Sequence, residues 1–327
     1  LPVMELNPEI VSKIHSLGGT ILGASRGYGD CVEEIVDSLE QMNINMLFII
    51  GGDGTQKGAL EIAEEAKKRS LKISIVGIPK TIDNDLSFVD KSFGFETAVS
   101  RAVDAVSCAH VEAHDGVNGI GIVKVMGRES GFIAANTALA INDVNYVLIP
   151  EVRFELEGEN GLFANLERRL KRLNHAVILV AEGAGQEYMK DSKAIDESGN
   201  AKLNDIGVFL KERIGEYFKM RKIDINLKYI DPSYMIRSAP ANSNDSVYCT
   251  KLGAYAVHAA MAGKTGMIVS FINSHFVHVP IRLTVSGRKR VDPHQELWRD
   301  VIEATGQPLL IQERRTKPRS EKARNAK

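Results

Sequence analysis

The chain is 327 residues long, with a formal net charge of −1 at pH 7, 44% hydrophobic residues and 25% charged residues. This length exceeds the roughly 100–200 residues of one domain, so we expect two domains, and the balanced charge predicts neither nucleic-acid nor membrane binding. No apolar run approaches the roughly 18 residues that span a bilayer, no signal peptide is visible, and the three scattered cysteines are typical of a reducing, cytoplasmic compartment.

Apolar runs of strand length alternate with amphipathic helical stretches, which is the pattern of a parallel α/β sheet. An exposed loop is expected over residues 190–203, and the Arg- and Lys-rich tail over 312–327 is predicted to be disordered. The predicted strands are 20–23, 46–50, 73–78, 119–124, 145–149, 176–181, 226–229 and 265–271, and the predicted helices are 31–42, 58–69, 95–114, 131–141, 163–173, 207–219 and 245–262.

Two motifs follow neighbouring predicted strands. Residues 51–55 read Gly-Gly-Asp-Gly-Thr, and residues 79–85 read Pro-Lys-Thr-Ile-Asp-Asn-Asp. A glycine turn after a buried strand lets backbone N–H groups approach phosphate oxygens, and the N-terminus of the next helix adds positive charge. The two acids of the second motif, beside a threonine, suit the orientation of a sugar and the removal of a proton from its hydroxyl. A phosphate cradle and a candidate base on adjacent strand ends indicate a kinase.

With three further motifs, the sequence resembles the phosphofructokinase family. These are Met-Gly-Arg-Glu-Ser-Gly-Phe-Ile-Ala at 126–134, Val-Ala-Glu-Gly at 180–183 and Tyr-Ile-Asp-Pro-Ser-Tyr-Met-Ile-Arg at 229–237. Over about residues 1–311 the chain is most similar to the ATP-dependent branch of plants, trypanosomatids and some bacteria. The resemblance implies two doubly wound, Rossmann-like parallel-sheet domains with the active site in the cleft between them. Residues 1–94 plus 238–284 would form the nucleotide-binding domain, and 95–237 plus 285–311 the sugar-phosphate domain.

The resemblance also implies an activity, which is glycolytic phosphoryl transfer from MgATP to the 1-hydroxyl of fructose 6-phosphate. By the family's pattern, Asp83 is the base that takes the hydroxyl proton, with Thr81 and Asp85 as its catalytic neighbours. Arg26 matches an arginine that stabilises the migrating phosphoryl group, and Asp53 matches the carboxylate that organises Mg²⁺. The implied sugar-phosphate contacts are Thr81, Asp83, Met126, Gly127, Arg128, Glu182, Lys228, Tyr234 and Arg237.

The phosphoryl donor is indicated by the residues of the nucleotide side. Gly54 leaves open the space in which pyrophosphate-using relatives carry an aspartate, so it favours ATP. Lys80 points the other way, because a lysine before the Thr-Ile-Asp-Asn-Asp stretch is also typical of pyrophosphate enzymes. We give Gly54 more weight because it acts by exclusion. The implied nucleotide contacts are Gly52, Asp53, Gly54, Thr55, Gly58 and Lys80.

The family pattern also bears on assembly and completeness. Lys228 matches a basic residue donated to a neighbouring subunit's 6-phosphate, so we expect a homo-oligomer, either tetramer or dimer. Gly119 stands where bacterial members place a second donor, an arginine. Members open with a strand and a Gly-Gly loop followed by Pro-Gly, which this sequence lacks, so we expect an N-terminally truncated chain. The alternatives are a pyrophosphate-dependent enzyme, and a non-catalytic or inactive truncated member that binds sugar phosphate only.

Overall fold

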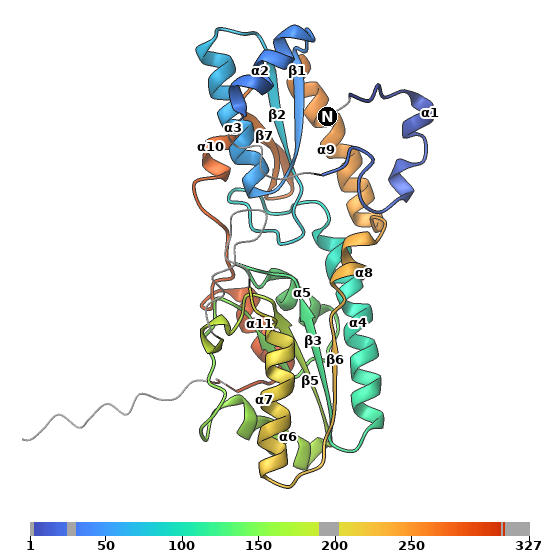
Figure 1. The fold of residues 1–327 in the computed structure, drawn as a ribbon, viewed down its shortest axis with the longest axis vertical. Helices are drawn as coiled ribbons and strands as arrows, with labels where there is room; N and C mark the ends of the chain where they lie inside the picture. The colour runs from blue at the N-terminus through green and yellow to red at the C-terminus, as the bar shows by residue number, and fades with distance from the viewer. Residues whose placement is uncertain (1–2, 25–30, 190–202, 309, 311–327) are drawn as a thin grey trace, which may run out of the picture.

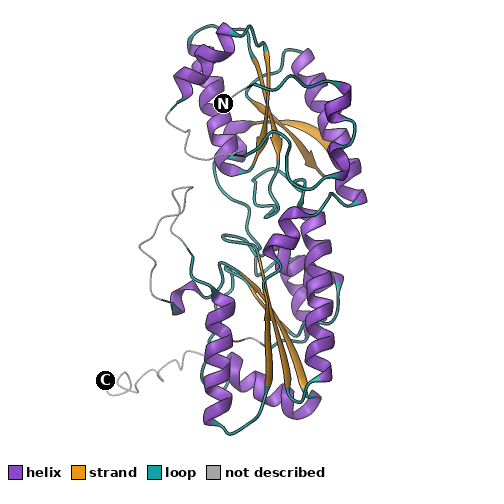
Figure 2. Cartoon of the chain, turned by 45° about the vertical axis from the view of Figure 1, so that its right-hand side comes forward, coloured by secondary structure: helices purple, strands orange, loops and turns teal. Residues whose placement is uncertain are grey.

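The computed structural model describes residues 3–24, 31–189, 203–308 and 310. The chain forms two lobes stacked along its longest axis, each built around its own sheet (Figures 1 and 2). The predicted tail 312–327, residues 190–202 of the predicted loop and the predicted phosphoryl contact Arg26 lie outside the described residues. No helix within the described residues has the length and apolar character needed to cross a membrane.

The first lobe contains a four-stranded sheet in the order β1-β2-β7-β8. Strands β1, β2 and β7 are parallel, whereas β8 is antiparallel to β7. Every residue of β2 is buried, as expected of a central strand in a sheet covered on both faces. The elements of this lobe are α1 (Pro8–Val11), η1 (Ile14–Ser16), α2 (Val32–Gln41), β1 (Met46–Gly51), α3 (Asp53–Lys68), β2 (Ser74–Pro79), α9 (Ser243–Met261), β7 (Met267–Ile272), β8 (His275–Pro280) and α10 (Ile281–Thr284).

The second lobe contains a fully parallel sheet in the order β4-β5-β3-β6. Apolar side chains from alternate positions of β3 and β5 enter two separate core clusters, so the sheet is packed on both faces. The elements are α4 (Phe95–Asp115), β3 (Gly119–Val125), α5 (Phe132–Ala140), β4 (Tyr146–Leu148), α6 (Leu162–Leu173), β5 (His175–Ala181), η2 (Gln186–Tyr188), α7 (Ile206–Met220), β6 (Asn226–Ile230), α8 (Ser233–Ser238) and α11 (Glu296–Thr305). The prediction of two Rossmann-like α/β units is therefore confirmed.

Some local predictions are wrong. Residues 20–23 form a turn and not a strand. Helix α3 begins at Asp53, five residues before the predicted start at Gly58, because the chain enters the helix directly from Gly52 at the end of β1. The structure also contains β8 and α11, which the sequence pattern does not predict. Strand β8 follows a tight turn in which Asn273 and Ser274 have φ of 48° and 67°, so it returns antiparallel to β7.

The two lobes are joined by side-chain hydrogen bonds as well as by the chain. Near the start of α4, the backbone N–H and the hydroxyl of Thr97 both donate to Asp245 Oδ2 on α9, at 2.8 and 2.6 Å. Helix α9 is capped by Asn242, whose side chain accepts from the Asp245 N–H at 2.9 Å. The fully buried Asp245 therefore holds α4 and α9 together at the junction of the lobes.

Candidate active site

A cleft of about 600 Å³ lies between the two lobes. Residues directly after β1, β2, β3 and β5 line it, together with residues of α8. The carboxyl ends of parallel strands from both sheets thus face one cavity, which is the usual place for a ligand in open α/β sheets. The predicted site residues that line the cleft are Gly52, Lys80, Thr81, Asp83, Met126, Glu182 and Arg237.

Asp83 is the most distinctive group in the cleft. Its backbone N–H donates to Thr81 Oγ1 at 3.2 Å, which shapes the turn after β2. The Ser130 hydroxyl, from the second lobe, donates to the Asp83 carbonyl at 3.2 Å. Within the described residues, the Asp83 side-chain oxygen Oδ1 is buried and accepts no hydrogen bond. A buried carboxylate oxygen without a donor is costly, and such groups are typical of functional sites.

The electrostatic environment makes Asp83 a stronger base than an ordinary aspartate. Burial raises the pKa of Asp83 to about 7, the Asp85 and Glu182 carboxylates add to the increase, and Arg237 and Arg288 oppose it. Burial likewise raises the pKa of Asp85, against the opposing charge of Arg288, and that of Glu182, against Arg237. A carboxylate with a pKa near the operating pH suits general base catalysis.

The acidic turn is held by two polar residues that the motif reading did not assign. Asn84 is buried and has φ of 52°. Its Oδ1 accepts from the Ser92 N–H at 2.9 Å and the Ser92 hydroxyl at 3.2 Å, and its amide donates to the Asp90 carbonyl at 3.0 Å. The Ser92 hydroxyl also donates to the Thr81 carbonyl at 2.6 Å. Asn84 and Ser92 therefore hold the turn that carries Asp83. The signal in the sequence was an asparagine between two aspartates, since asparagine tolerates positive φ.

The glycine motif forms the junction between β1 and α3. Asp53 is the first residue of the helix, and its carboxylate is 2.9 Å from Lys57 Nζ. A Cβ added to Gly54 would meet no atom within 4 Å, so the space beside it is open. The fully buried Gln56 donates to the carbonyls of Gly51 at 3.1 Å and Ile78 at 3.2 Å. Gln56 thereby ties together the two strand ends that carry the motifs, a role that was not predicted.

A second unassigned segment, residues 286–290, lies against the acidic turn. Arg288 Nη2 is 3.3 Å from Asp53 Oδ2, and the Lys289 N–H donates to the Asp85 carbonyl at 2.8 Å. The Lys289 ammonium donates to the carbonyls of Val89 and Asp90 at 2.7 and 3.2 Å. Burial lowers the pKa of Lys289 to about 8, although Asp90 and Asp85 oppose the change. Arg288 therefore stands between the acidic groups of both motifs, more than 200 residues after the first of them.

On the second lobe, the turn after β3 packs against the end of β5. The Gly183 N–H donates to the Gly127 carbonyl at 3.1 Å. Gly127 has φ of 132°, and a Cβ at Gly183 would collide with the carbonyl of Arg128. Both positions therefore require glycine. This close packing places Met126 and Glu182 side by side in the cleft lining.

Helix α8 brings Arg237 to the same cleft. The Arg237 Nε contacts Met126 Sδ at 3.1 Å. Tyr234 is 88% exposed on the same helix and does not line the cleft. Lys228 on β6 is 3.4 Å from Glu112 of α4 and does not line this cleft either. The other predicted residues with described positions do not line the cavity themselves. Gly58 lies further along α3, and the rest belong to motifs that contribute cleft residues: Asp53, Gly54, Thr55, Asp85, Gly127 and Arg128.

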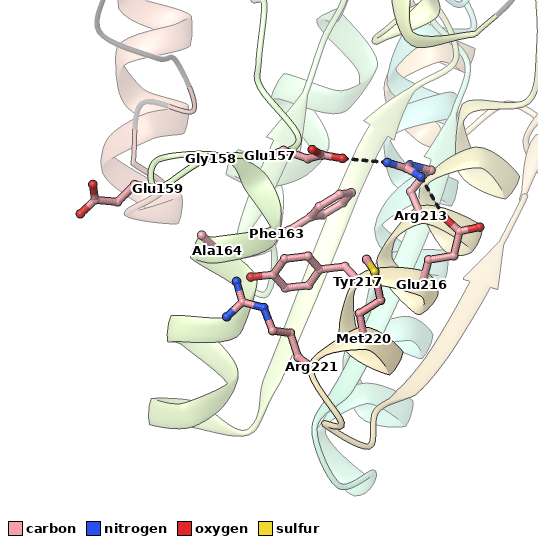
Figure 3. Close-up of a pocket in the computed structure, with 10 residues that line it drawn as sticks. All are labelled: Glu157, Gly158, Glu159, Phe163, Ala164, Arg213, Glu216, Tyr217, Met220 and Arg221. Atoms are coloured by element: carbon pink, nitrogen blue, oxygen red, sulfur yellow. Dashed lines mark hydrogen bonds and ion pairs between the residues drawn. The ribbon is translucent and has the colours of Figure 1, made fainter.

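Another cavity, of about 500 Å³, lies on the second lobe between α6 and α7 (Figure 3). Phe163 and Tyr217 form part of its wall, and Arg213 pairs with Glu157 and Glu216 at 2.8 Å at its edge. It contains none of the predicted site residues. The cleft between the lobes therefore remains the candidate active site.

Two Rossmann-like lobes with acidic and basic side chains converging between their strand ends define the class: a two-lobed α/β protein with a ligand-sized cleft between its sheets. The phosphofructokinase family model matches residues 2–260, so the chain belongs to the phosphofructokinase family.

Curated relatives are named as ATP-dependent 6-phosphofructokinases. The protein of that name from Borreliella burgdorferi is 60% identical over 95% of this chain and 71% of its own length. ATP-dependent 6-phosphofructokinase 5, chloroplastic, from Arabidopsis thaliana is 48% identical over 95% of this chain and 58% of its own length. The Trypanosoma brucei brucei protein is 48% identical over 92% of this chain and 62% of its own length. The chain thus spans between 58% and 71% of the length of these relatives.

Solved structures agree on the fold. The crystal structure of pyrophosphate-dependent phosphofructokinase from Marinobacter aquaeolei has a TM-score of 0.72 and 22% sequence identity, covering 95% of this chain and 78% of that one. At this identity the likeness extends to the fold alone. The arrangement of two lobes around the cleft is therefore shared with a phosphofructokinase of known structure.

Proposed function

We propose that this protein transfers the terminal phosphoryl group of MgATP to the 1-hydroxyl of fructose 6-phosphate, giving fructose 1,6-bisphosphate and ADP. The observation that carries the proposal is Asp83, a carboxylate with a pKa of about 7 and a bare, buried oxygen in a cleft between the lobes. In this role Asp83 takes the proton of the attacking hydroxyl. Thr81 and the neighbouring Asp85 hold the turn and the substrate beside it.

Binding of the sugar phosphate falls to the second lobe. Glu182 stands opposite Asp83 in the cleft, where a carboxylate reads hydroxyl groups, and Arg237 supplies a guanidinium that suits bidentate contact with the 6-phosphate. Both residues are electrostatically coupled to Asp83, since Glu182 raises its pKa and Arg237 lowers it. A substrate with hydroxyls at one end and a phosphate at the other fits this distribution of charge.

The nucleotide side supports ATP as the donor. The open space beside Gly54 leaves room for phosphates beyond the one transferred, and the curated relatives are named ATP-dependent enzymes. The described residues contain no cluster of three or more metal-ligating side chains. Asp53, the first residue of α3, would hold Mg²⁺ together with nucleotide oxygens, because Mg²⁺ usually combines one or two carboxylates with substrate phosphates. When bound, the ion supplies positive charge to the phosphate oxygens.

The test is a coupled assay of the intact protein with fructose 6-phosphate and either MgATP or pyrophosphate. We expect turnover with MgATP and none with pyrophosphate, whereas the reverse result would make Lys80 the better guide to the donor. Asp83→Asn should lower kcat by about 10²–10⁴-fold. Asp104→Asn, on the exposed face of α4, is the matched control and should leave kcat unchanged. An active Asp83→Asn variant would refute the assignment of the base.

We also propose a homo-oligomer in which Lys228 reaches a neighbouring subunit's 6-phosphate. Lys228 is 53% exposed and its contact with Glu112 spans 3.4 Å, so this ion pair is weak and Lys228 is free to contact a phosphate instead. Sedimentation analysis tests the assembly. A monomeric protein with full activity would exclude this role of Lys228.

A further inference from the structure

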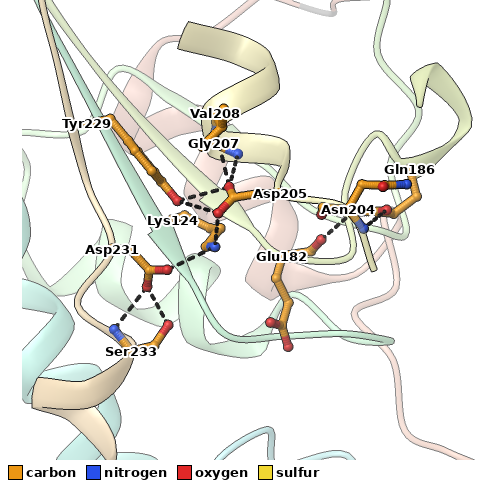
Figure 4. A network of polar contacts seen from close by, with 10 residues as sticks. All are labelled: Lys124, Glu182, Gln186, Asn204, Asp205, Gly207, Val208, Tyr229, Asp231 and Ser233. Atoms are coloured by element: carbon orange, nitrogen blue, oxygen red, sulfur yellow. Dashed lines mark hydrogen bonds and ion pairs between the residues drawn. The ribbon is translucent and has the colours of Figure 1, made fainter. Parts of the chain in front are cut away.

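The Lys124 ammonium lies at the centre of a polar network at the carboxyl end of β3 (Figure 4). Lys124 Nζ is 2.7 Å from Asp205 Oδ2 and 2.9 Å from Asp231 Oδ2. Its side chain is only 12% exposed, and its ammonium lies 5.9 Å from the centre of the Tyr229 ring. A lysine held in this way by two carboxylates is a fixed point in the lobe and not a solvated surface charge.

One arm of the network leads to α8, the helix that carries Arg237. The Asp231 Oδ1 accepts from the N–H of Ser233 at 3.1 Å and also from the Ser233 hydroxyl. Ser233 is the first residue of α8, and Arg237 lies one turn further along that helix. The salt bridge from Lys124 to Asp231 therefore determines where α8 starts and in which direction it carries Arg237 towards the cleft.

The other arm leads to Glu182, the carboxylate of the second lobe that lines the cleft. Asp205 caps α7 by accepting from the N–H groups of Gly207 and Val208 at 2.9 and 3.1 Å. It directly follows Asn204, whose N–H donates to Gln186 Oε1 at 3.1 Å. The Gln186 amide donates to the Glu182 carbonyl at 2.7 Å and to the Asn204 carbonyl at 3.1 Å. The backbone that carries Glu182 is thus tied to the residue next to Asp205.

The charges in the network favour its fully ionised form. Burial opposes the charge on Lys124, but the hydrogen bonds to Asp205, Asp231 and Tyr229 outweigh it and raise the pKa of Lys124 above its usual value. Burial also opposes ionisation of Asp205 and Asp231. Hydrogen bonds that Lys124 and Val208 donate lower the pKa of Asp205 below its usual value, and hydrogen bonds that Ser233 and Lys124 donate do the same for Asp231. The network is therefore ionised at neutral pH and holds without a ligand.

We propose that Lys124 is a positioning residue that sets the spacing between Glu182 and Arg237, and so selects a sugar of the right length between its hydroxyls and its phosphate. This inference rests on the proposed function. Lys124 itself does not line the cleft. It acts by holding the end of β5 and the start of α8 against the same strand, β3.

The test compares Lys124→Met with Lys171→Met in the intact protein. Lys171 pairs with Glu167 at 2.7 Å on the surface of α6, so it is a matched control for the loss of a salt-bridged lysine. We expect Lys124→Met to raise KM for fructose 6-phosphate at least tenfold, with kcat and KM for MgATP changed less than threefold. Lys124→Arg should recover most of the loss, because a guanidinium can still pair with both carboxylates. Lys171→Met should change none of these values.

Two further measurements separate this inference from its alternatives. Asp231→Asn removes only the salt bridge between Lys124 and Asp231, at a half-exposed site. It should raise KM for fructose 6-phosphate, and it provides a test even if Lys124→Met fails to fold. Hydrogen exchange should speed up in α8 in both variants, and around Asn204 only in Lys124→Met. Unchanged exchange and an unchanged KM would overturn the positioning role. An unmodified protein that does not phosphorylate fructose 6-phosphate would instead overturn the proposed function, while the exchange data would still test the network.

Discussion

Asp83→Asn should make the ligand-free protein more stable at alkaline pH while destroying its activity. Folding raises the pKa of Asp83 from 3.8 to about 7, chiefly through burial. A carboxyl group whose pKa is raised in the folded state contributes its full stability below the unfolded value, near pH 4. That contribution is lost as the pH rises through about 7. Asparagine has a similar shape and cannot ionise, so it avoids this loss.

The size of the effect follows from the pKa. A difference of one pKa unit corresponds to about 1.4 kcal/mol, so a change from 3.8 to about 7 corresponds to about 4 kcal/mol. Asp83 as a whole residue is only partly buried, so water in the cleft screens part of this cost. Asp83→Asn changes the free energy of unfolding by an amount that depends on pH. We expect this change to be about 2–4 kcal/mol more stabilising at pH 8 than at pH 4.5.

The assay is urea unfolding of the unmodified protein, Asp83→Asn and the control Asp104→Asn at pH 4.5, 6 and 8. The gain from Asp83→Asn should grow with pH, with its midpoint between the two pKa values. Asp104 is exposed and paired with Arg101 on the surface of α4, so its replacement should change stability by less than about 0.5 kcal/mol at every pH. A difference between Asp83→Asn and the unmodified protein that stays constant across this pH range would refute the argument.

Three other substitutions test the cleft. Arg288→Ala should lower kcat by about 10²-fold, in line with the loss of one charge-stabilising group. It should also move the acidic limb of the kcat/KM profile to higher pH, because Arg288 lowers the pKa of Asp83. An unmoved limb would contradict this. Arg237→Ala should raise KM for fructose 6-phosphate far more than KM for MgATP, and a larger effect on MgATP would show that the arginine serves the nucleotide. Asn84→Ala should lower the free energy of unfolding by about 2–4 kcal/mol in urea titrations. The substitution removes the hydrogen bonds to Ser92 and Asp90 and places alanine at φ 52°. A loss below about 1 kcal/mol would show that the turn holds without Asn84.

The sequence alone determined the elements whose signal is local. The apolar runs at 46–50 and 73–78 became β1 and β2, and their glycine and acidic motifs follow directly after the strands. Strand ends in a parallel sheet lie at one edge, so the meeting of Gly52 with Asp83 in one cleft followed from the order of strands and motifs. The family resemblance was likewise readable, because it rests on short contiguous motifs.

The tertiary structure decided what depends on residues far apart in the chain. Arg288 reaches Asp53 across 235 positions, and Lys124 meets Asp205 across 81. No local periodicity encodes such pairs, because each depends on how two separately formed elements pack.

The raised pKa of Asp83 also depends on the tertiary structure. An aspartate in a turn motif is ordinarily solvated, whereas here burial, with the Asp85 and Glu182 carboxylates adding to it, raises the pKa of Asp83 to about 7. The motif places a carboxylate at the strand end by local geometry. The packing of two lobes removes water from it, and desolvation is a property of the whole fold.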